Sequence, residues 1–457
     1  MRHHSSRPSG RGGAGQILAL TWPIFIELLL QLMVGNADQM MVGWHDPNGV
    51  GAIGNANQIT NLLLLVFSVV CTASMILISQ YIGAKDTRKV KQIYAVSLAA
   101  NLVFGLVVSL FLLIFSPWVF RLMGVQAVMF DQACLYMRII GLGMVFQAVY
   151  LTFTAFFRSS QMMKETMVVS VVMNCLNIGG NALLINGVPA VGLPALGVAG
   201  AAISSGISRV MGVVIIGVLL RIRFGPVLRL ADLRPFPWEE LRRLLRIGIP
   251  TGGESVSYNL SQIGVQTVCN VFPAFVVNTR VYATMFANVT YLFGSAMSQA
   301  CQVVVARLMG GGEIAQTDRQ VKTAVLLSTG VSAAVSVALY VLCEPVYRIF
   351  TTDPQVLALA KTIMLIEIPL EAGRGINMVM VRALQACGDI RFPVTICIIA
   401  AWIVGVGGSY LFGVVWGMGL AGLWIAMALD ELIRAGLFLW RWHGGSWCRK
   451  QLLEPND

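Results

Sequence analysis

Long apolar stretches recur along the whole chain and are separated by short polar segments. Most approach or exceed the ~18 to 20 residues that a helix needs to cross the hydrocarbon core of a bilayer. The pattern predicts an all-α polytopic membrane protein with twelve spanning helices, six in each half. The predicted spans are 17–42, 52–82, 93–115, 132–157, 166–186, 197–220, 247–270, 279–308, 323–343, 358–385, 394–415 and 419–440.

The two halves of the chain carry matched features at a fixed offset of 227 residues. The matched pairs are Pro23 and Pro250, Glu27 and Glu254, Gly83 and Gly310, and Phe120-Arg121 and Tyr347-Arg348. A later motif, GVAGAA from Gly197, is echoed by GLAGLW from Gly419, where the offset is 222. Two similar apolar halves are typical of secondary transporters. Because each half has an even number of helices, we expect two parallel repeats.

The spans divide the chain into five predicted parts. They are a disordered basic tail (1–16), a first lobe of helices one to six (17–221), a cytoplasmic linker (222–246), a second lobe of helices seven to twelve (247–442) and a cytoplasmic tail (443–457).

Composition excludes an ordinary water-soluble protein, since 57% of residues are hydrophobic, 12% are charged and the mean hydropathy is +0.76. Lys and Arg gather in the terminal tails, the linker and alternate loops, which predicts that both termini lie in the cytoplasm and the chain in the plasma (inner) membrane. The opposite side has only Arg121, Arg280, Arg348 and Lys361. Because the net charge of +11 is dispersed over loops, we expect no nucleic-acid partner.

No catalytic or metal site is predicted. The nine cysteines show no metal-ligand spacing, and none of the four histidines falls within a predicted span. We therefore expect neither an enzyme nor a cofactor.

Charged side chains inside the spans are the most informative residues, since each costs roughly 2.5 to 3.5 kcal/mol to insert. Glu27 and Asp38 lie on one stripe of the first helix, joined by Gln31. No basic residue lies within helical reach of Asp38, so this acid is a candidate to exchange a proton for a cargo. The alternative is a structural hydrogen bond to a neighbouring helix.

In the second half, Glu254 is followed on the same face by Tyr258, Ser261 and Gln262, a pattern that lines cavities. On helix ten, the spacing of Glu371 and Arg374 predicts a buried ion pair, either structural or involved in gating. On helix twelve, Asp430 or Glu431 can pair with Arg434, and there we favour a structural role.

Three asparagines on helix five, Asn174, Asn177 and Asn181, recur at helical spacing and form a polar ladder. The ladder lines either an aqueous cleft or a set of interhelical hydrogen bonds. The full set of cavity residues expected from these patterns is Glu27, Gln31, Gln147, Tyr150, Asn174, Asn177, Asn181, Tyr258, Gln262, Glu367, Glu371, Arg374 and Asn377.

Several motifs together resemble the multidrug and toxic compound extrusion (MATE) family of antiporters. They are Pro23, the run GNADQMMVG containing Asp38, NCLNIGGNALLINGV from Asn174, GLPALGVAGAA from Gly192, IPTGGE ending at Glu254 and RALQACGDIRFP from Arg382. The resemblance implies a V-shaped fold of two six-helix lobes that alternates between outward-open and inward-open states. It also implies export of cationic or amphipathic small molecules against an inward flow of protons or sodium, with Asp38 and Glu254 as the coupling acids.

Two positions depart from the family pattern. In the DinF-like branch a second acid on helix five pairs with the helix-one aspartate, but the corresponding position here is Asn181. In the NorM-like branch an acid on helix ten helps to hold sodium, whereas the corresponding position here falls near Arg374, with Glu371 one turn away. Because a positive charge opposes sodium binding, we favour protons.

Other classes remain open as alternatives. A flippase for lipid-linked sugars, or another exporter of non-drug metabolites with related architecture, would be expected to hold several basic residues in its cavity. A channel is disfavoured by the two-lobe repeat. We expect the protein to function as a monomer in the lipid bilayer.

Overall fold

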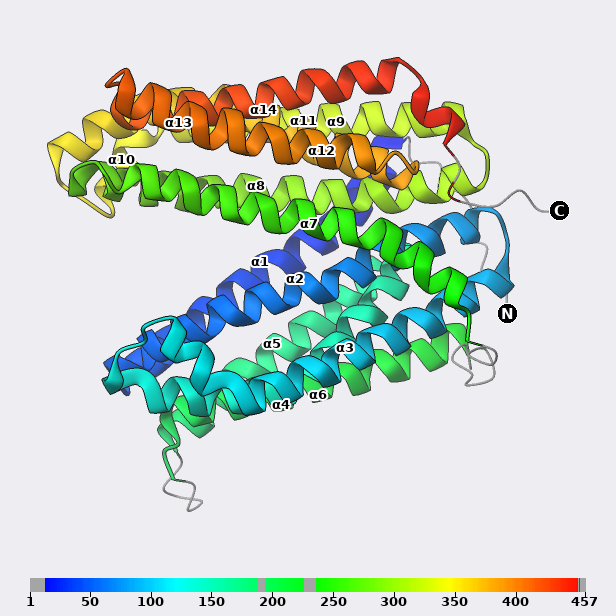
Figure 1. The fold of residues 1–457 in the computed structure, drawn as a ribbon, viewed down its shortest axis with the longest axis horizontal. Helices are drawn as coiled ribbons and strands as arrows, with labels where there is room; N and C mark the ends of the chain where they lie inside the picture. Colours follow the sequence, from blue (N-terminus) through cyan, green and yellow to red (C-terminus); the bar gives the residue numbers. More distant parts are fainter. Residues whose placement is uncertain (1–12, 188–193, 226–235, 451, 453–457) are drawn as a thin grey trace. The chain divides into compact units, whose positions relative to one another are not determined.

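The computed structural model describes residues 13–187, 194–225, 236–450 and 452, and this part of the chain is helical with short connections (Figure 1). Most of the predicted basic tail and part of the predicted linker, residues 226–235, lie outside the described residues.

Six long helices make up the first half. They are α1 (Gly13–Gly43), α2 (Pro47–Gly83), α3 (Thr87–Leu122), α4 (Ala127–Ser159), α5 (Met163–Asn186) and α6 (Gly197–Phe224). The elements of the second half are α7 (Trp238–Cys269), α8 (Ala274–Gly310), α9 (Ile314–Val341), α10 (Cys343–Arg348), α11 (Pro354–Ala386), α12 (Arg391–Ala400), η3 (Ala401–Gly407), α13 (Gly408–Tyr410), η4 (Leu411–Val415), α14 (Gly419–His443) and η5 (Ser446–Arg449).

Nine helical segments of the described chain are long and apolar enough to cross a bilayer, with α12 to η4 counted as one continuous segment, 391–415. Three further long helices, α7, α11 and α14, bring the number to the predicted twelve. These three carry the charged side chains of the second half, including Glu254, Glu371 and Glu431. Their charged side chains, rather than their length, therefore set these three helices apart from the other nine.

The predicted repeat is visible in the helix boundaries. The first and last residues of α2 and α8 are separated by the offset of 227 found in the sequence, and so are those of α4 and α11. The hydrophobic cores also correspond, because residues at this offset are buried in both halves. Corresponding core pairs are Ala56 and Ala283, Phe120 and Tyr347, and Met137 and Met364.

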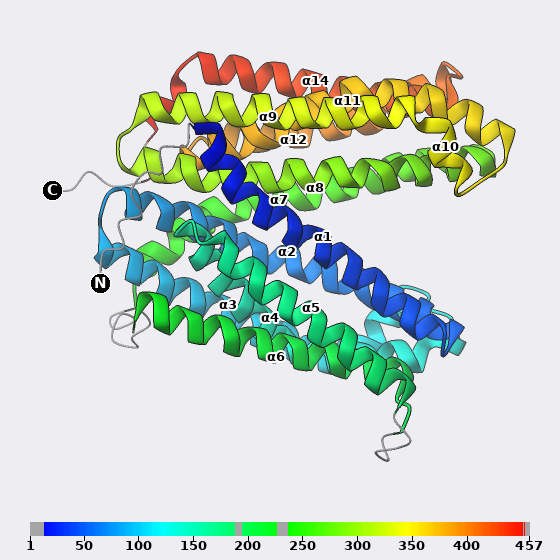
Figure 2. The same ribbon diagram turned by 180° about the vertical axis from the view of Figure 1, so that it is seen from behind.

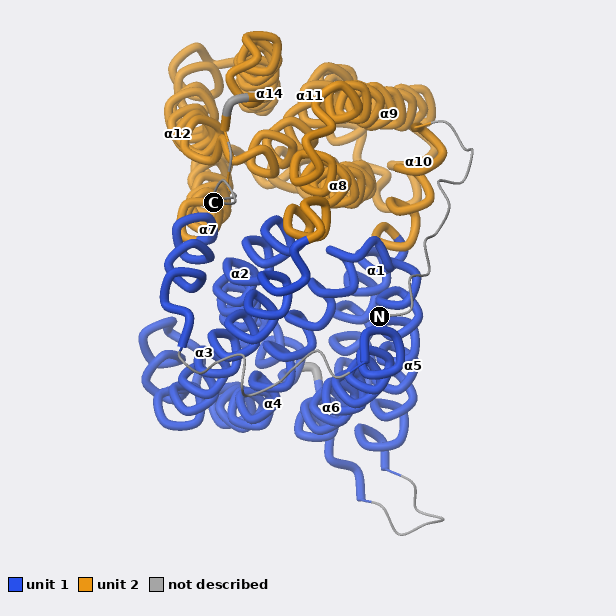
Figure 3. The backbone as a smooth tube through the Cα atoms, turned by 90° about the vertical axis from the view of Figure 1, so that its right-hand side faces the viewer, with its two compact units in different colours: residues 1–5, 26–78, 86–248 blue, residues 6–25, 79–85, 249–457 orange. Residues whose placement is uncertain are grey.

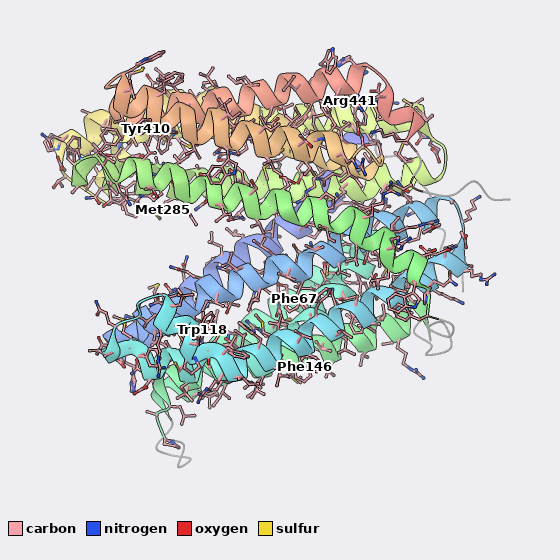
Figure 4. All side chains as sticks on the ribbon, in the orientation of Figure 1. Phe67, Trp118, Phe146, Met285, Tyr410 and Arg441 are labelled. Carbon is pink, nitrogen blue, oxygen red and sulfur yellow. The ribbon has the colours of Figure 1, made fainter. Side chains whose placement is uncertain are left out.

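Each half builds its own core around one central helix. In the first half α4 packs against α3 and α6, and in the second α11, the counterpart of α4, packs against α8, α9 and α14 (Figure 2). Apolar side chains that do not enter the cores lie on the outside, as Trp118, Met285 and Tyr410 illustrate (Figure 4). An apolar exterior is what a lipid-embedded surface requires.

The chain forms two compact units, and three helices are divided between them (Figure 3). Of the described residues, those within 26–78 and 86–248 form unit 1, and those within 13–25, 79–85 and 249–452 form unit 2. The division falls inside α1, in the last turns of α2 and inside α7. In α1 and α7 it is close to Pro23 and Pro250. A proline removes one helical hydrogen bond, so it is a natural place for a helix to bend.

Two repeat-related glycines meet where α2 and α8 end, within unit 2. A Cβ atom added to Gly83 would lie 2.0 Å from the carbonyl oxygen of Arg307, and one added to Gly310 would lie 1.9 Å from that of Gln80. Since Arg307 and Gln80 are themselves at the offset of 227, the contact is reciprocal. Only glycine permits the two backbones to approach this closely.

Candidate functional site

Asp38, on α1, is buried and bonded to the helix-five position that departs from the family pattern. Its Oδ1 accepts a hydrogen bond of 2.5 Å from Nδ2 of Asn181, and only 8% of the residue is exposed. The Arg209 guanidinium on α6 and Tyr136 on α4 lie within electrostatic reach of the carboxyl group. Asp38 thus has both the predicted interhelical hydrogen bond and a basic neighbour contributed by another helix.

Two residues of the asparagine ladder on α5, Asn177 and Asn181, form hydrogen bonds to neighbouring helices. Asn177 donates to Oγ of Ser205 at 3.0 Å, and its own carbonyl oxygen accepts from Ser204 at 2.8 Å. Asn174 keeps a buried Nδ2 with no hydrogen-bond partner among the described residues. The ladder therefore combines interhelical bonding with one unsatisfied donor.

Glu27 forms a separate cluster further along α1. Its Oε2 lies 2.9 Å from Nη2 of Arg158 and accepts a hydrogen bond of 3.4 Å from Thr166, and the residue is 1% exposed. Tyr150 is buried, with a hydroxyl that has no partner among the described residues. Gln31, by contrast, is exposed, so it does not join Glu27 to Asp38 as a buried relay.

The second unit holds a larger cluster, built from α11 and α14. Arg374 pairs with Glu371, as predicted, and its Nε lies 3.5 Å from Oε1 of Glu431. The other contacts are Arg434 with Asp430 at 2.5 Å and with Glu431 at 3.1 Å, Asn377 donating to Glu431 at 2.6 Å, and Trp424 donating to Glu367 at 2.5 Å.

The cluster has more acidic than basic side chains, which favours binding of a proton or another cation. Four buried carboxyl groups, those of Glu367, Glu371, Asp430 and Glu431, face two guanidinium groups, those of Arg374 and Arg434. If every group is ionised, two negative charges remain unmatched. An unmatched buried charge costs several kcal/mol, so binding of a proton or a cation would stabilise the cluster.

Two of the predicted site residues on α7, Glu254 and Tyr258, lie near the cluster of the second unit. Glu254 is partly exposed and has Gln385, Arg382 and Arg434 as its neighbours. Tyr258 lies within electrostatic reach of Arg374 and Glu431. Gln262 and Gln147 are partly exposed.

The sequence interpretation missed three basic residues. Arg209 lies in the middle of α6, and its spacing of four residues from Ser205 was the available signal. Arg158 was counted only as a loop charge, yet it neutralises Glu27. Arg280 was counted only as an outward charge, yet it is buried with its guanidinium 5.8 Å from the ring centre of Trp424. Among the described residues, no group of three His, Cys, Asp or Glu could hold a metal ion.

Comparison with known proteins gives one consistent result. The sequence profile of the MatE family matches residues 23–183 and 250–411, one copy in each half. The chain is 35% identical over 434 residues to the uncharacterized transporter YisQ of Bacillus subtilis, which covers 95% of both chains. It is 25% identical to the probable multidrug resistance protein NorM of Thermotoga maritima, over 96% of this chain and 94% of the relative.

Solved structures share the fold. The Vibrio cholerae MATE transporter VcmN in its bent form superimposes with a TM-score of 0.87 at 19% identity, covering 96% of this chain and 97% of that one. The outward-facing conformation of a multidrug resistance MATE family transporter gives a TM-score of 0.85 at 20% identity, covering 96% of this chain and 97% of that one.

Proposed function

This chain belongs to the MATE family of membrane transporters, and from that premise we propose that it is a secondary active multidrug exporter driven by protons. Its cargo would be cationic or lipophilic small molecules, moved by alternating access. We place it in the plasma membrane as a monomer, with both termini in the cytoplasm.

The excess of buried carboxyl groups carries this proposal. The cluster of α11 and α14 has two more acids than bases, and unit 1 adds Asp38. A protein interior with surplus negative charge attracts cations and repels anions. The relatives named as multidrug resistance proteins support a drug cargo for this chain.

Protons suit the neighbourhood of these acids better than sodium does. Arg374 and Arg434 lie among the acids of the second unit, and Arg209 lies near Asp38. A metal cation would have to sit beside these fixed positive charges. A proton instead forms a covalent bond to one carboxylate oxygen and needs no shell of ligands.

In the proposed cycle, Asp38 takes up a proton from outside, and the charge that attracted the cargo is lost. Asn181 then no longer faces a carboxylate, so the hydrogen bond that joins α5 to α1 weakens. Release of the proton toward the cytoplasm restores the acid for the next cargo. Proton and cargo must therefore oppose each other in binding, and this coupling is reciprocal.

The test is efflux of ethidium from proteoliposomes under an imposed proton or sodium gradient, in the wild type and in Asp38→Asn. We expect proton-driven efflux in the wild type and its loss in the variant. An Asp38→Asn variant that exports against a gradient at the wild-type rate would remove Asp38 from the mechanism. Sodium-driven efflux, or none under either gradient, would contradict the proposed coupling ion or the proposed cargo.

A further inference from the structure

The two repeat-related acids Glu27 and Glu254 have different partners, although the helices around them correspond. The penultimate residue of α4 is Arg158, and the penultimate residue of α11 is Gln385. These two positions are separated by the same 227 residues as the two acids. An arginine in the first repeat is therefore replaced by a neutral amide in the second.

In unit 1 the acid is fixed by a charged partner. The Glu27 carboxylate lies 2.9 Å from Arg158 and also accepts from Thr166, and it is almost completely buried. The charge pair with Arg158 and the bond from Thr166 together fix the position of the Glu27 carboxylate in this buried site. The residue at the place of Thr166 in the second repeat is Val394, which lies three residues into α12 as Thr166 lies three residues into α5.

In unit 2 the corresponding acid, Glu254, has no charged partner of this kind. No ion pair joins Glu254 to another described residue, and the side chain is partly exposed. Its neighbours are Gln385 and Arg382 on α11, Arg434 on α14 and Cys397 on α12.

Both neighbouring arginines also bond other residues. Arg434 is held by Asp430 at 2.5 Å and by Glu431 at 3.1 Å. Arg382 donates to Oε1 of Gln385 at 3.4 Å. The Gln385 side chain lies within reach of the Glu254 carboxylate, and its buried amide Nε2 is the group that can donate to it.

We infer that Gln385 is a positioning residue that leaves Glu254 free to bind and release the coupling cation, while Arg158 makes Glu27 a fixed structural anion. This inference rests on the proposed cation-coupled transport. Glu27 and Glu254 occupy equivalent positions in the sequence repeat, but only Glu254 would exchange the coupling cation.

The experiment installs the arrangement of the first repeat in the second. Purified transporter is treated with dicyclohexylcarbodiimide, which modifies protonated carboxyl groups in apolar surroundings, and modified residues are found by peptide mass spectrometry. In the wild type we expect modification of Glu254 and not of Glu27. Gln385→Arg should lower modification of Glu254 by about tenfold or more, since a close opposite charge favours the ionised, unreactive form of the carboxyl group.

Transport gives the second measurement. Gln385→Arg should reduce proton-driven ethidium efflux to the level of Glu254→Gln. The reciprocal change, Arg158→Gln, should make Glu27 reactive. If that variant does not fold, Gln385→Arg alone decides the question, because it adds a partner for an existing charge.

The outcomes distinguish failure of this inference from failure of the proposed function. If Glu254→Gln loses efflux but Gln385→Arg keeps wild-type efflux and modification, the inference is overturned and the proposed function stands. If Glu254→Gln keeps proton-driven efflux, Glu254 does not couple transport, and the inference fails with it.

Discussion

Glu431 shows how a buried carboxylate is stabilised by several partners inside the protein. It accepts a hydrogen bond from Asn377 and pairs with Arg374 and Arg434, so three partners from two helices satisfy one carboxylate. Partners on the same helix follow from spacing, and the pairs of Glu371 with Arg374 and of Arg434 with its preceding acids were predictable.

Partners on different helices were not predictable from spacing. Glu27 meets Arg158 and Asp38 meets Asn181 across more than a hundred residues of chain, because packing of whole helices brings them together. Sequence periodicity specifies the face on which a residue lies, but it does not specify which helix covers that face.

Removing Arg434 should be among the most destabilising single changes in the second unit. Arg434→Met leaves Asp430 and Glu431 without their shared partner, and breaking a buried pair typically costs about 3–5 kcal/mol. The matched control is Arg348→Met, which breaks a pair with Glu344 at the same i,i+4 spacing but on the surface, where about 0–1 kcal/mol is expected. Thermal unfolding in detergent should rank Arg434→Met far below the control, and equal melting temperatures would contradict this reading.

Individual helices were predictable in number and order, and less so in extent and detail. All twelve predicted spans correspond to helical segments, but α2 begins at Pro47 where the span was predicted from residue 52. The extra turns are polar enough to lie beyond the hydrocarbon, so hydropathy does not detect them. The π-helical turns η3 and η4 were not predicted, since no local residue pattern separates them from ordinary helix.

The crossing of α2 and α8 depends on having no side chain at two points. Gly83→Ala or Gly310→Ala would place a Cβ within about 2 Å of a backbone oxygen, which forces the helices apart and should cost at least about 1–3 kcal/mol. Gly54→Ala, also on α2, meets no atom within 4 Å and should be neutral or stabilising by up to about 1 kcal/mol.

The melting temperatures of the three variants test this expectation, and those of Gly83→Ala and Gly310→Ala should be lower than that of Gly54→Ala. A Gly83→Ala variant as stable as Gly54→Ala would show that the crossing tolerates a wider separation than the structure has.

For the whole molecule, the repeat was the most reliable sequence signal. The offset of 227 recurs in the bounds of α2 and α8 and of α4 and α11, because insertions are confined to the loops and the later helices. The sequence could not reveal which helices are shared between units, since this depends on packing partners that lie outside each repeat.

The proposed orientation can be measured directly in cells. With the native cysteines replaced, His45→Cys should react with a membrane-impermeant maleimide added from outside, because its loop precedes α2 on the extracytoplasmic side of the proposed topology. Arg88→Cys, exposed at the start of α3, should react only after the membrane is permeabilised. The opposite pattern would invert the protein in the membrane, and with it the direction assigned to the proton.

The division of α1 and α7 between units also bears on how such a chain arose. The first turns of α1 belong to unit 2, and the first turns of α7 belong to unit 1. An ancestor with a single repeat would have had to place those turns on a second copy of itself, as in a domain-swapped dimer. Fusion of two such copies into one chain would convert an encounter between two molecules into an intramolecular one, at an effective concentration that two separate molecules rarely reach.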